Sequence, residues 1–201
     1  MKKSFNFVFI LSFPIIFGII AISKYFVPLF FGQGYQKVIV LINILSPIIL
    51  AIGLSNVIGT QYLLAVKRQK EFTISVISGA IINFIINMML IWKYASVGAA
   101  IGTVIAESCV TAIQFFFIKS DFDIKEILKM SIKYIISSII MFICCIFIGS
   151  IIQNSMYNIL IQVVSGFFIY VIVLLVLDDD FLKLILIKMK ENIKGDYNEK
   201  I

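Results

Sequence analysis

The chain has 201 residues, 61% of them hydrophobic, and it contains no histidine. The absence of histidine excludes Ser-His-Asp and Cys-His catalysis, and it also excludes histidine-based metal sites. The formal net charge is +6, but no soluble stretch is long enough to fold into a basic face for DNA or RNA. We therefore expect no nucleic-acid partner and interpret the positive charge as a signal of membrane topology.

Six apolar stretches fill most of the chain, and each is about long enough to cross a bilayer. A transmembrane helix needs about 20 apolar residues to cross ~30 Å of hydrocarbon. The pattern predicts an all-α polytopic membrane protein in which residues 1–177 form a six-helix transmembrane unit. The expected spans are approximately Phe5–Ser23, Val38–Val66, Phe72–Trp92, Ala95–Ile118, Ile132–Ile152 and Tyr157–Leu177. Residues 121–133 are expected to be a charged connector, and residues 178–201 an amphipathic tail.

Most basic residues lie on one side of these expected spans, because connections rich and poor in Lys and Arg alternate along the chain. They precede the first span, follow the second, separate the fourth from the fifth and follow the sixth, as at Lys2, Arg68, Lys125 and Lys183. Short loops rich in Lys and Arg remain in the cytoplasm. The alternation therefore predicts a multi-pass protein of the plasma membrane with both termini in the cytoplasm. The basic loops also indicate contact with membrane lipids that carry anionic headgroups.

The fourth expected span carries two patterns with a spacing of about four residues. Residues at this spacing share one face of a helix. The polar pattern consists of Thr103, Glu107, Thr111 and Gln114. The second pattern consists of the small residues Gly98, Gly102 and Ala106. Small residues at this spacing allow a neighbouring membrane helix to approach closely.

Glu107 is the only acidic residue that the sequence places near the middle of a span. Ionisable residues inside membranes usually face protein or water, and many belong to ion pathways. One hypothesis is that Glu107 takes up and releases a proton or a sodium ion during a transport cycle. The alternative is that Glu107 is neutral, or hydrogen-bonded to the second or third span, and serves only packing.

The second and third expected spans carry amide side chains, at Asn56 in one and at Asn83 and Asn87 in the other. These amides either hold helices together through hydrogen bonds or line a polar cavity. Lys24 ends the first span; it either extends to the headgroups or faces an anionic phosphate in a cavity. The last two spans are almost wholly apolar, which predicts four inner spans around a cavity and two peripheral ones.

Four segments in order resemble one family of membrane proteins. They are Pro28–Tyr35 (a loop containing Gly32-Gln33-Gly34-Tyr35), Asn56–Leu64 followed by a basic turn, Ser78–Asn87, and Val97–Glu107 with its Gly98-Ala99-Ala100-Ile101 start. In this order they resemble the second half of bacterial flippases for polysaccharide biosynthesis, in the multidrug/oligosaccharidyl-lipid/polysaccharide exporter superfamily, which is MATE-like.

The resemblance implies one lobe of a two-lobe transporter that works by alternating access. It implies a lipid-linked oligosaccharide, carried on undecaprenyl diphosphate, as the substrate, and a second six-helix lobe as partner. That partner would be a missing N-terminal half or a second copy of the chain. The resemblance implies no cofactor, and proton or sodium coupling is compatible with it.

Two other functions remain open at this point. A drug or organic-cation exporter of the same superfamily would use acidic cavity residues, whereas a diphosphate would favour basic ones, and the sequence offers Glu107 and Lys24. A non-transporting accessory membrane protein is the other alternative. A membrane-embedded enzyme is disfavoured because the chain has no pair of aspartates within a span and no nucleophile elbow.

Overall fold

The computed structural model describes residues 1–151 and 155–188, and within them all regular structure is helical. The helices, with one π-helix labelled η1, are α1 (Lys2–Phe31), α2 (Gln36–Leu45), α3 (Ile48–Ser55), η1 (Asn56–Leu63), α4 (Gln69–Tyr94), α5 (Ser96–Ile118), α6 (Ile124–Ile151) and α7 (Ser155–Val176). A short helix at 180–188 follows. The segment of the expected tail at 189–201 lies outside the described residues. Six membrane-length apolar helices occur in the described part of the chain, with α2, α3 and η1 together forming one of them.

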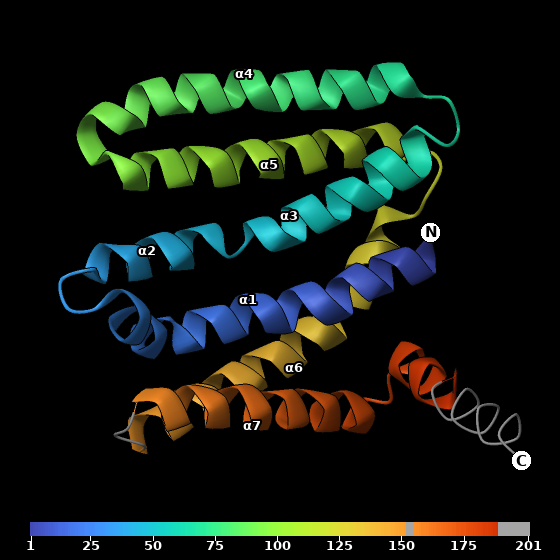
Figure 1. Ribbon diagram of the computed structural model, residues 1–201. Helices are drawn as coiled ribbons and strands as arrows, with labels where there is room; N and C mark the ends of the chain where they lie inside the picture. The colour runs from blue at the N-terminus through green and yellow to red at the C-terminus, as the bar shows by residue number, and fades with distance from the viewer. Residues whose placement is uncertain (152–154, 189–201) are drawn as a thin grey trace, which may run out of the picture.

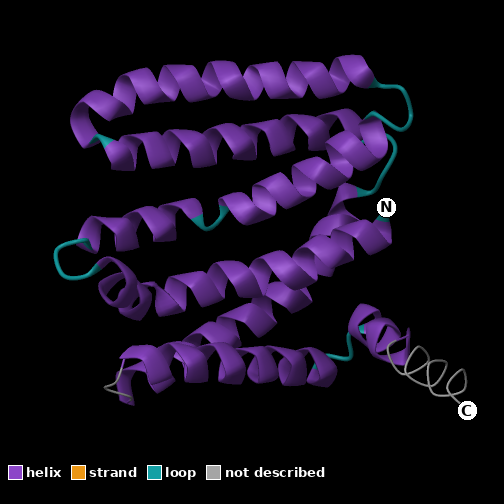
Figure 2. Ribbon diagram, viewed as in Figure 1, coloured by secondary structure: helices purple, strands orange, loops and turns teal. Residues whose placement is uncertain are grey.

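The helices are arranged in a row, which Figure 1 shows from one side. Helix α4 packs on α5, and α5 packs on α2 and α3. Next comes α1, which packs on α3, α6 and α7. No strand occurs among the described residues, so the secondary structure in Figure 2 is helix and loop throughout. The N-terminus, the helix at 180–188 and the η1–α4 and α5–α6 loops all lie on the side where the helices have their right-hand ends in Figure 1. Because Lys2, Lys3 and Arg68 belong to this side, it is called the basic end of the row below.

The second span is interrupted twice. Helix α2 ends at Leu45, and α3 begins at Ile48, directly after Pro47. Proline has no backbone N–H to donate and its ring crowds the preceding turn, which accounts for the break. From Asn56 to Leu63 the helix continues with the wider π pattern. π-helical turns are rare and often occur at functional sites.

Helix α6 begins earlier than the sequence predicted. The charged connector expected at 121–133 does not form a separate surface element, because α6 is continuous from Ile124. Asp123 explains this start, since its Oδ1 accepts hydrogen bonds from the backbone N–H of Lys125 at 2.9 Å and of Glu126 at 3.4 Å. An aspartate in this position satisfies N–H groups that a helix start leaves without partners.

The prediction of four inner spans and two peripheral final ones is wrong for α4 and for α6. Helix α4 lies at one edge of the row and has two buried residues, Ser75 and Gly79. Helix α6 has eight buried residues, because it packs against both α1 and α7. An apolar sequence does not distinguish a helix that faces lipid from one that faces other helices, since leucine and lipid are similarly apolar.

The core of the bundle contains stacked aromatic rings on α1. Phe5, Phe9 and Phe13 form a continuous stack, with ring centroids 6.4 and 5.8 Å apart. Phe5 also contacts Phe115 of α5, and Phe9 contacts Tyr134 of α6. Aromatic pairs at such distances contribute about 0.5–1.5 kcal/mol beyond the burial of their area. The stack therefore joins the two sides of the row through α1.

Candidate functional site

A polar cavity of about 590 Å³ lies where α3, η1, α4 and α5 meet. Its polar lining residues come from three of the expected spans: Ser55, Asn56, Thr60, Asn83 and Glu107. The structure thus brings together Asn56, Asn83 and Glu107, which the sequence marked as candidates on separate helices. Polar groups in a membrane tend to face protein or water, and these side chains share one such space.

Small residues on α4 and α5 allow the two helices to approach closely beside this cavity. A Cβ atom added to Gly79 would lie 2.2 Å from Cγ2 of Val110. A Cβ atom added to Gly102 would lie 2.3 Å from Oδ1 of Asn87. The ridge of small residues predicted on the fourth span is therefore a true contact surface, and its partner is α4.

Glu107 lines the cavity from α5, where it is half-buried. Its backbone carbonyl accepts a hydrogen bond from Thr111. In the part of the chain that the structure describes, its carboxylate takes part in no ion pair or hydrogen bond. The alternative of a packing role through hydrogen bonds to the second or third span therefore finds no support among these residues. An uncompensated carboxyl group near mid-membrane is costly, which makes it a candidate for function.

The amides beside Glu107 are only partly satisfied. Asn87 donates from Nδ2 to Oδ1 of Asn83 at 2.7 Å, one turn earlier on α4. Oδ1 of Asn87 is buried and has no hydrogen-bond donor within the described chain. On η1, Thr60 donates from Oγ1 to the backbone carbonyl of Asn56 at 2.5 Å, and both residues line the cavity.

Three other predicted residues of the fourth span do not line the cavity, and two of them serve contacts between helices. Thr111 donates from Oγ1 to the carbonyl of Ala51 on α3 at 2.8 Å. Gln114 is fully buried and donates from Nε2 to Oγ of Ser75 on α4 at 3.2 Å. Thr103 donates to the carbonyl of Ala99 within α5. The polar face of the fourth span is therefore divided between one cavity residue, Glu107, and residues that bond to the backbone or to neighbouring helices.

Lys24 lies apart from the cavity, exposed near the end of α1 that is remote from the N-terminus. It is not among the cavity-lining residues, and the cavity lining that the structure describes contains no basic side chain. The structure therefore separates Lys24 from the other candidates. The described residues also contain no group of three His, Cys, Asp or Glu side chains that could hold a metal ion.

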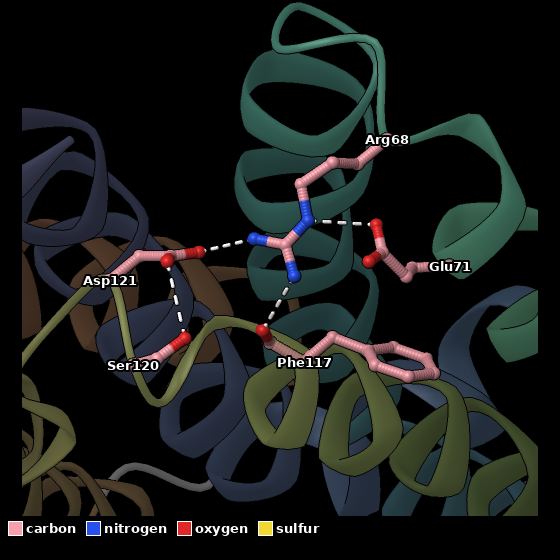
Figure 3. Close-up of polar contacts among 5 residues, drawn as sticks. All are labelled: Arg68, Glu71, Phe117, Ser120 and Asp121. Carbon is pink, nitrogen blue, oxygen red and sulfur yellow. Dashed lines mark hydrogen bonds and ion pairs between the residues drawn. The ribbon is translucent and has the colours of Figure 1, made fainter.

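Sequence reasoning missed a cluster of charges at the basic end of the row, which Figure 3 shows. Arg68 donates from Nε to Glu71 at 2.8 Å, from Nη2 to the carbonyl of Phe117 at 2.8 Å, and from Nη1 to Asp121. Ser120 donates to the second carboxylate oxygen of Asp121 at 3.2 Å. One guanidinium thus connects the start of α4 to the α5–α6 loop.

The electrostatics of this cluster favour its charged form. Partial desolvation acts against the charge of Asp121, but hydrogen bonds from Arg68, Tyr62 and Ser120 outweigh it and hold the pKa of Asp121 below its usual value. Hydrogen bonds to Glu71 and Asp121 raise the pKa of Arg68 further above its already high value. A planar guanidinium suits this role because it offers several donors in a fixed arrangement. No sequence spacing indicates this pairing, since Arg68 and Asp121 are 53 residues apart.

Comparison with known proteins adds to this geometry. No family model matches the sequence. Over 90 residues, which are 45% of this chain, the sequence is 30% identical to the protein named "Putative O-antigen transporter" from Escherichia coli strain K12. The fold matches the structure of lipid II flippase MurJ in its inward closed conformation, with a TM-score of 0.71 over 84% of this chain and 22% sequence identity. The chain is similar in sequence to part of a putative O-antigen transporter and in fold to part of a lipid II flippase.

These matches confirm the predicted resemblance to flippases for polysaccharide biosynthesis, while the MATE-like part of that prediction stays a prediction, and they confirm the all-α transporter fold. The chain spans 22% of the length of the O-antigen transporter and 36% of the length of the MurJ chain. It therefore corresponds to a part of each of these proteins.

Proposed function

We propose that this chain is a six-helix lobe of a flippase that moves undecaprenyl-diphosphate-linked oligosaccharides across the bacterial plasma membrane for polysaccharide biosynthesis. The proposal makes the chain a transporter component and not an enzyme. The observation that carries it is the polar cavity of about 590 Å³ within the spans of a fold like that of MurJ. The charge rule supports placing both termini in the cytoplasm.

A second six-helix lobe completes the transporter in this proposal. The chain corresponds to 36% of the MurJ chain, which leaves room for such a lobe. The cavity supports the same idea, since exposing Glu107 and Asn83 to hydrocarbon would cost free energy. The second lobe is either a missing N-terminal half or a second copy of this chain. Alternating access then follows from rocking of the two lobes around the site between them.

Glu107 is the proposed coupling residue, which binds a proton or a sodium ion in one state of the cycle and releases it in the other. The test is flipping of a labelled lipid-linked oligosaccharide by the assembled two-lobe protein in vesicles, measured at several pH values. We expect Glu107→Gln to abolish the pH dependence or the response to sodium. The matched control is Ser108→Ala, one residue along α5, whose hydroxyl donates to the carbonyl of Val104 within the same helix. Normal flipping by Glu107→Gln with an unchanged pH and sodium response would exclude the coupling role.

A specific observation favours a second candidate function, export of organic cations. The cavity lining contains one acidic side chain, Glu107, and no basic one among the described residues. A cationic drug would be stabilised by this charge, whereas a diphosphate would need basic groups from the second lobe. Transport of a labelled organic cation by the assembled protein, without restoration of polysaccharide export in a flippase-deficient strain, would favour this second function.

A non-transporting accessory role makes a different prediction about water. If the cavity serves transport, cysteines placed at Asn56 and Asn83 should react with a water-soluble thiol reagent in membranes, because both positions line the cavity. A cysteine at Thr103, which does not line it, is the internal control. Equal lack of reaction at all three positions would favour the accessory role.

A further inference from the structure

An apolar groove of about 720 Å³ lies on the other side of the row, between α1, α6, α7 and the helix at 180–188. Aliphatic and aromatic side chains form nearly all of its surface, including Leu11, Ile22, Met141 and Phe167. The two larger polar residues in its lining donate hydrogen bonds within the protein, although the buried Oε1 of Gln162 has no hydrogen-bond partner among the described residues. Tyr170 donates from its hydroxyl to the carbonyl of Ile10 at 3.0 Å, and the Gln162 amide donates to Asn158.

A smaller pocket of about 310 Å³ adjoins the groove at the basic end of the row. It contains the polar side chains of Lys3, Ser4 and Gln61, and Phe7 lines both this pocket and the groove. Lys3 forms no ion pair with any residue at 1–151 or 155–188, whereas its neighbour Lys2 pairs with Glu126 at 2.6 Å. A free ammonium group with a hydroxyl and an amide beside it is suited to a phosphate group.

The short helix at 180–188 helps to form both spaces. Its first turn is fixed by Asp179, whose Oδ1 accepts hydrogen bonds from the backbone N–H of Leu182 at 2.8 Å and from the hydroxyl of Tyr134 at 3.4 Å. Phe181 lines the polar pocket, and Leu182 lines the groove. The helix therefore holds the charged pocket and the apolar groove next to each other.

The dimensions of the groove fit one hydrocarbon chain. Along α1 the groove extends from Phe7 to Ile22, which corresponds to about 22 Å at the helical rise of 1.5 Å per residue. One leaflet of the hydrocarbon core is about 15 Å thick, half of ~30 Å. A chain that begins at the polar pocket can therefore lie in the groove along its whole length.

We propose that this combined site binds an anionic phospholipid from the leaflet at the basic end of the protein. The phosphate group lies near Lys3, Ser4 and Gln61, and one acyl chain occupies the groove. An acyl chain gains little free energy by leaving other lipid chains for an apolar groove, because both surroundings are equally apolar. The polar pocket therefore supplies the selectivity for an anionic headgroup, and the groove supplies a shape that fits one acyl chain. The site is separate from the polar cavity, so the proposal is independent of the proposed transport function.

The test is native mass spectrometry of the purified full chain in detergent with added phosphatidylglycerol or phosphatidylcholine. We expect Lys3→Gln to weaken phosphatidylglycerol binding about fivefold, which corresponds to about 1 kcal/mol per basic residue at an anionic surface. Phosphatidylcholine binding should change little. The control is Lys37→Gln at the start of α2, at the opposite end of the protein.

A second pair of variants tests the groove. A Cβ atom added to Gly18 would have 4.0 Å to its nearest neighbour, so Gly18→Leu can fill the groove without a backbone clash, whereas Gly18→Ala leaves it mostly open. We expect Gly18→Leu to weaken binding of both lipids and Gly18→Ala to weaken neither. If Gly18→Leu does not fold, Ile22→Phe takes its place. Undiminished phosphatidylglycerol binding in Lys3→Gln, or equal loss in Lys37→Gln, would overturn the proposal, as would undiminished binding in the groove-filling variant.

Discussion

The contact between Gly79 and Val110 offers a quantitative test of the packing beside the cavity. In Gly79→Ala, the new methyl group would lie 2.2 Å from Cγ2 of Val110 and 3.4 Å from the carbonyl oxygen of Ala106. Valine in a helix is restricted to one main rotamer, so Val110 cannot turn away at no cost. Overpacking of this kind typically costs about 1–3 kcal/mol, and we expect a loss of that size in the free energy of unfolding.

The assay is thermal unfolding of the purified protein in detergent. A destabilisation of about 1 kcal/mol lowers Tm by roughly 2–4 °C in a chain of this size. Gly18→Ala is the matched control, since its new methyl group would meet nothing closer than 4.0 Å. It should be neutral or slightly stabilising, because alanine is about 0.5–1 kcal/mol better than glycine inside a helix.

A double variant separates the clash from any other effect of the substitution. Val110→Ala removes the atom that the new methyl group would meet, so Gly79→Ala combined with Val110→Ala should be more stable than the sum of the two single changes predicts. Strict additivity, or a Gly79→Ala protein as stable as Gly18→Ala, would refute the close approach of α4 and α5 at this point.

Three further predictions concern other contacts. Because the folded-state pKa of Asp121 is depressed, its contribution to stability should be present above its unfolded pKa of about 3.9 and be lost as pH falls through the folded value. The difference in Tm between wild type and Asp121→Asn should therefore shrink below about pH 4. A constant difference would count against the ion pair with Arg68. Gly98→Ala should destabilise strongly, because its methyl group would lie 2.5 Å from the backbone oxygen of Leu90, and normal yield and Tm would contradict this. Tyr170→Phe should lower the free energy of unfolding by about 0.6 kcal/mol, a typical value for a hydrogen bond between membrane helices. Reversible unfolding in mixed micelles measures this difference. An unchanged free energy of unfolding would show that the bond to the Ile10 carbonyl contributes nothing.

The sequence predicted most of the helices because hydropathy over about 20 residues is a strong signal in a membrane protein. It also predicted the close approach along Gly98 and Gly102, since small residues at a spacing of four within a span are typical of a helix–helix contact. Pro14 and Pro28 both lie inside α1, whereas Pro47 separates two helices. The residue type alone does not distinguish these outcomes, because neighbouring helices can compensate for a lost hydrogen bond.

The candidate site was only partly predictable. A spacing of four places Glu107 and Thr111 on one side of α5, but helical periodicity does not tell which neighbour each side chain meets. In the structure Thr111 reaches a carbonyl on α3, while Glu107 lies in the cavity one turn away. Asn56 and Thr60 belong to a π-helical segment, where the angular spacing of an α-helix no longer applies. The contact between Arg68 and Asp121 depends on how two loops meet, which no local pattern encodes.

The distribution of charge supports a functional role for Glu107 more than its position alone does. The ion pairs among the described residues, such as those of Arg68 with Asp121 and Lys183 with Asp178, lie at or beyond the ends of the spans. Water and headgroups stabilise charges there, so an ion-pair partner adds little to the stability of each carboxylate. Glu107 lies within a span, where a partner would matter most, and has none in the described chain. Natural sequences accept such a local conflict mainly at functional sites. The missing compensation is therefore expected from outside the described residues, in the form of water, a bound cation or a polar face of the proposed second lobe.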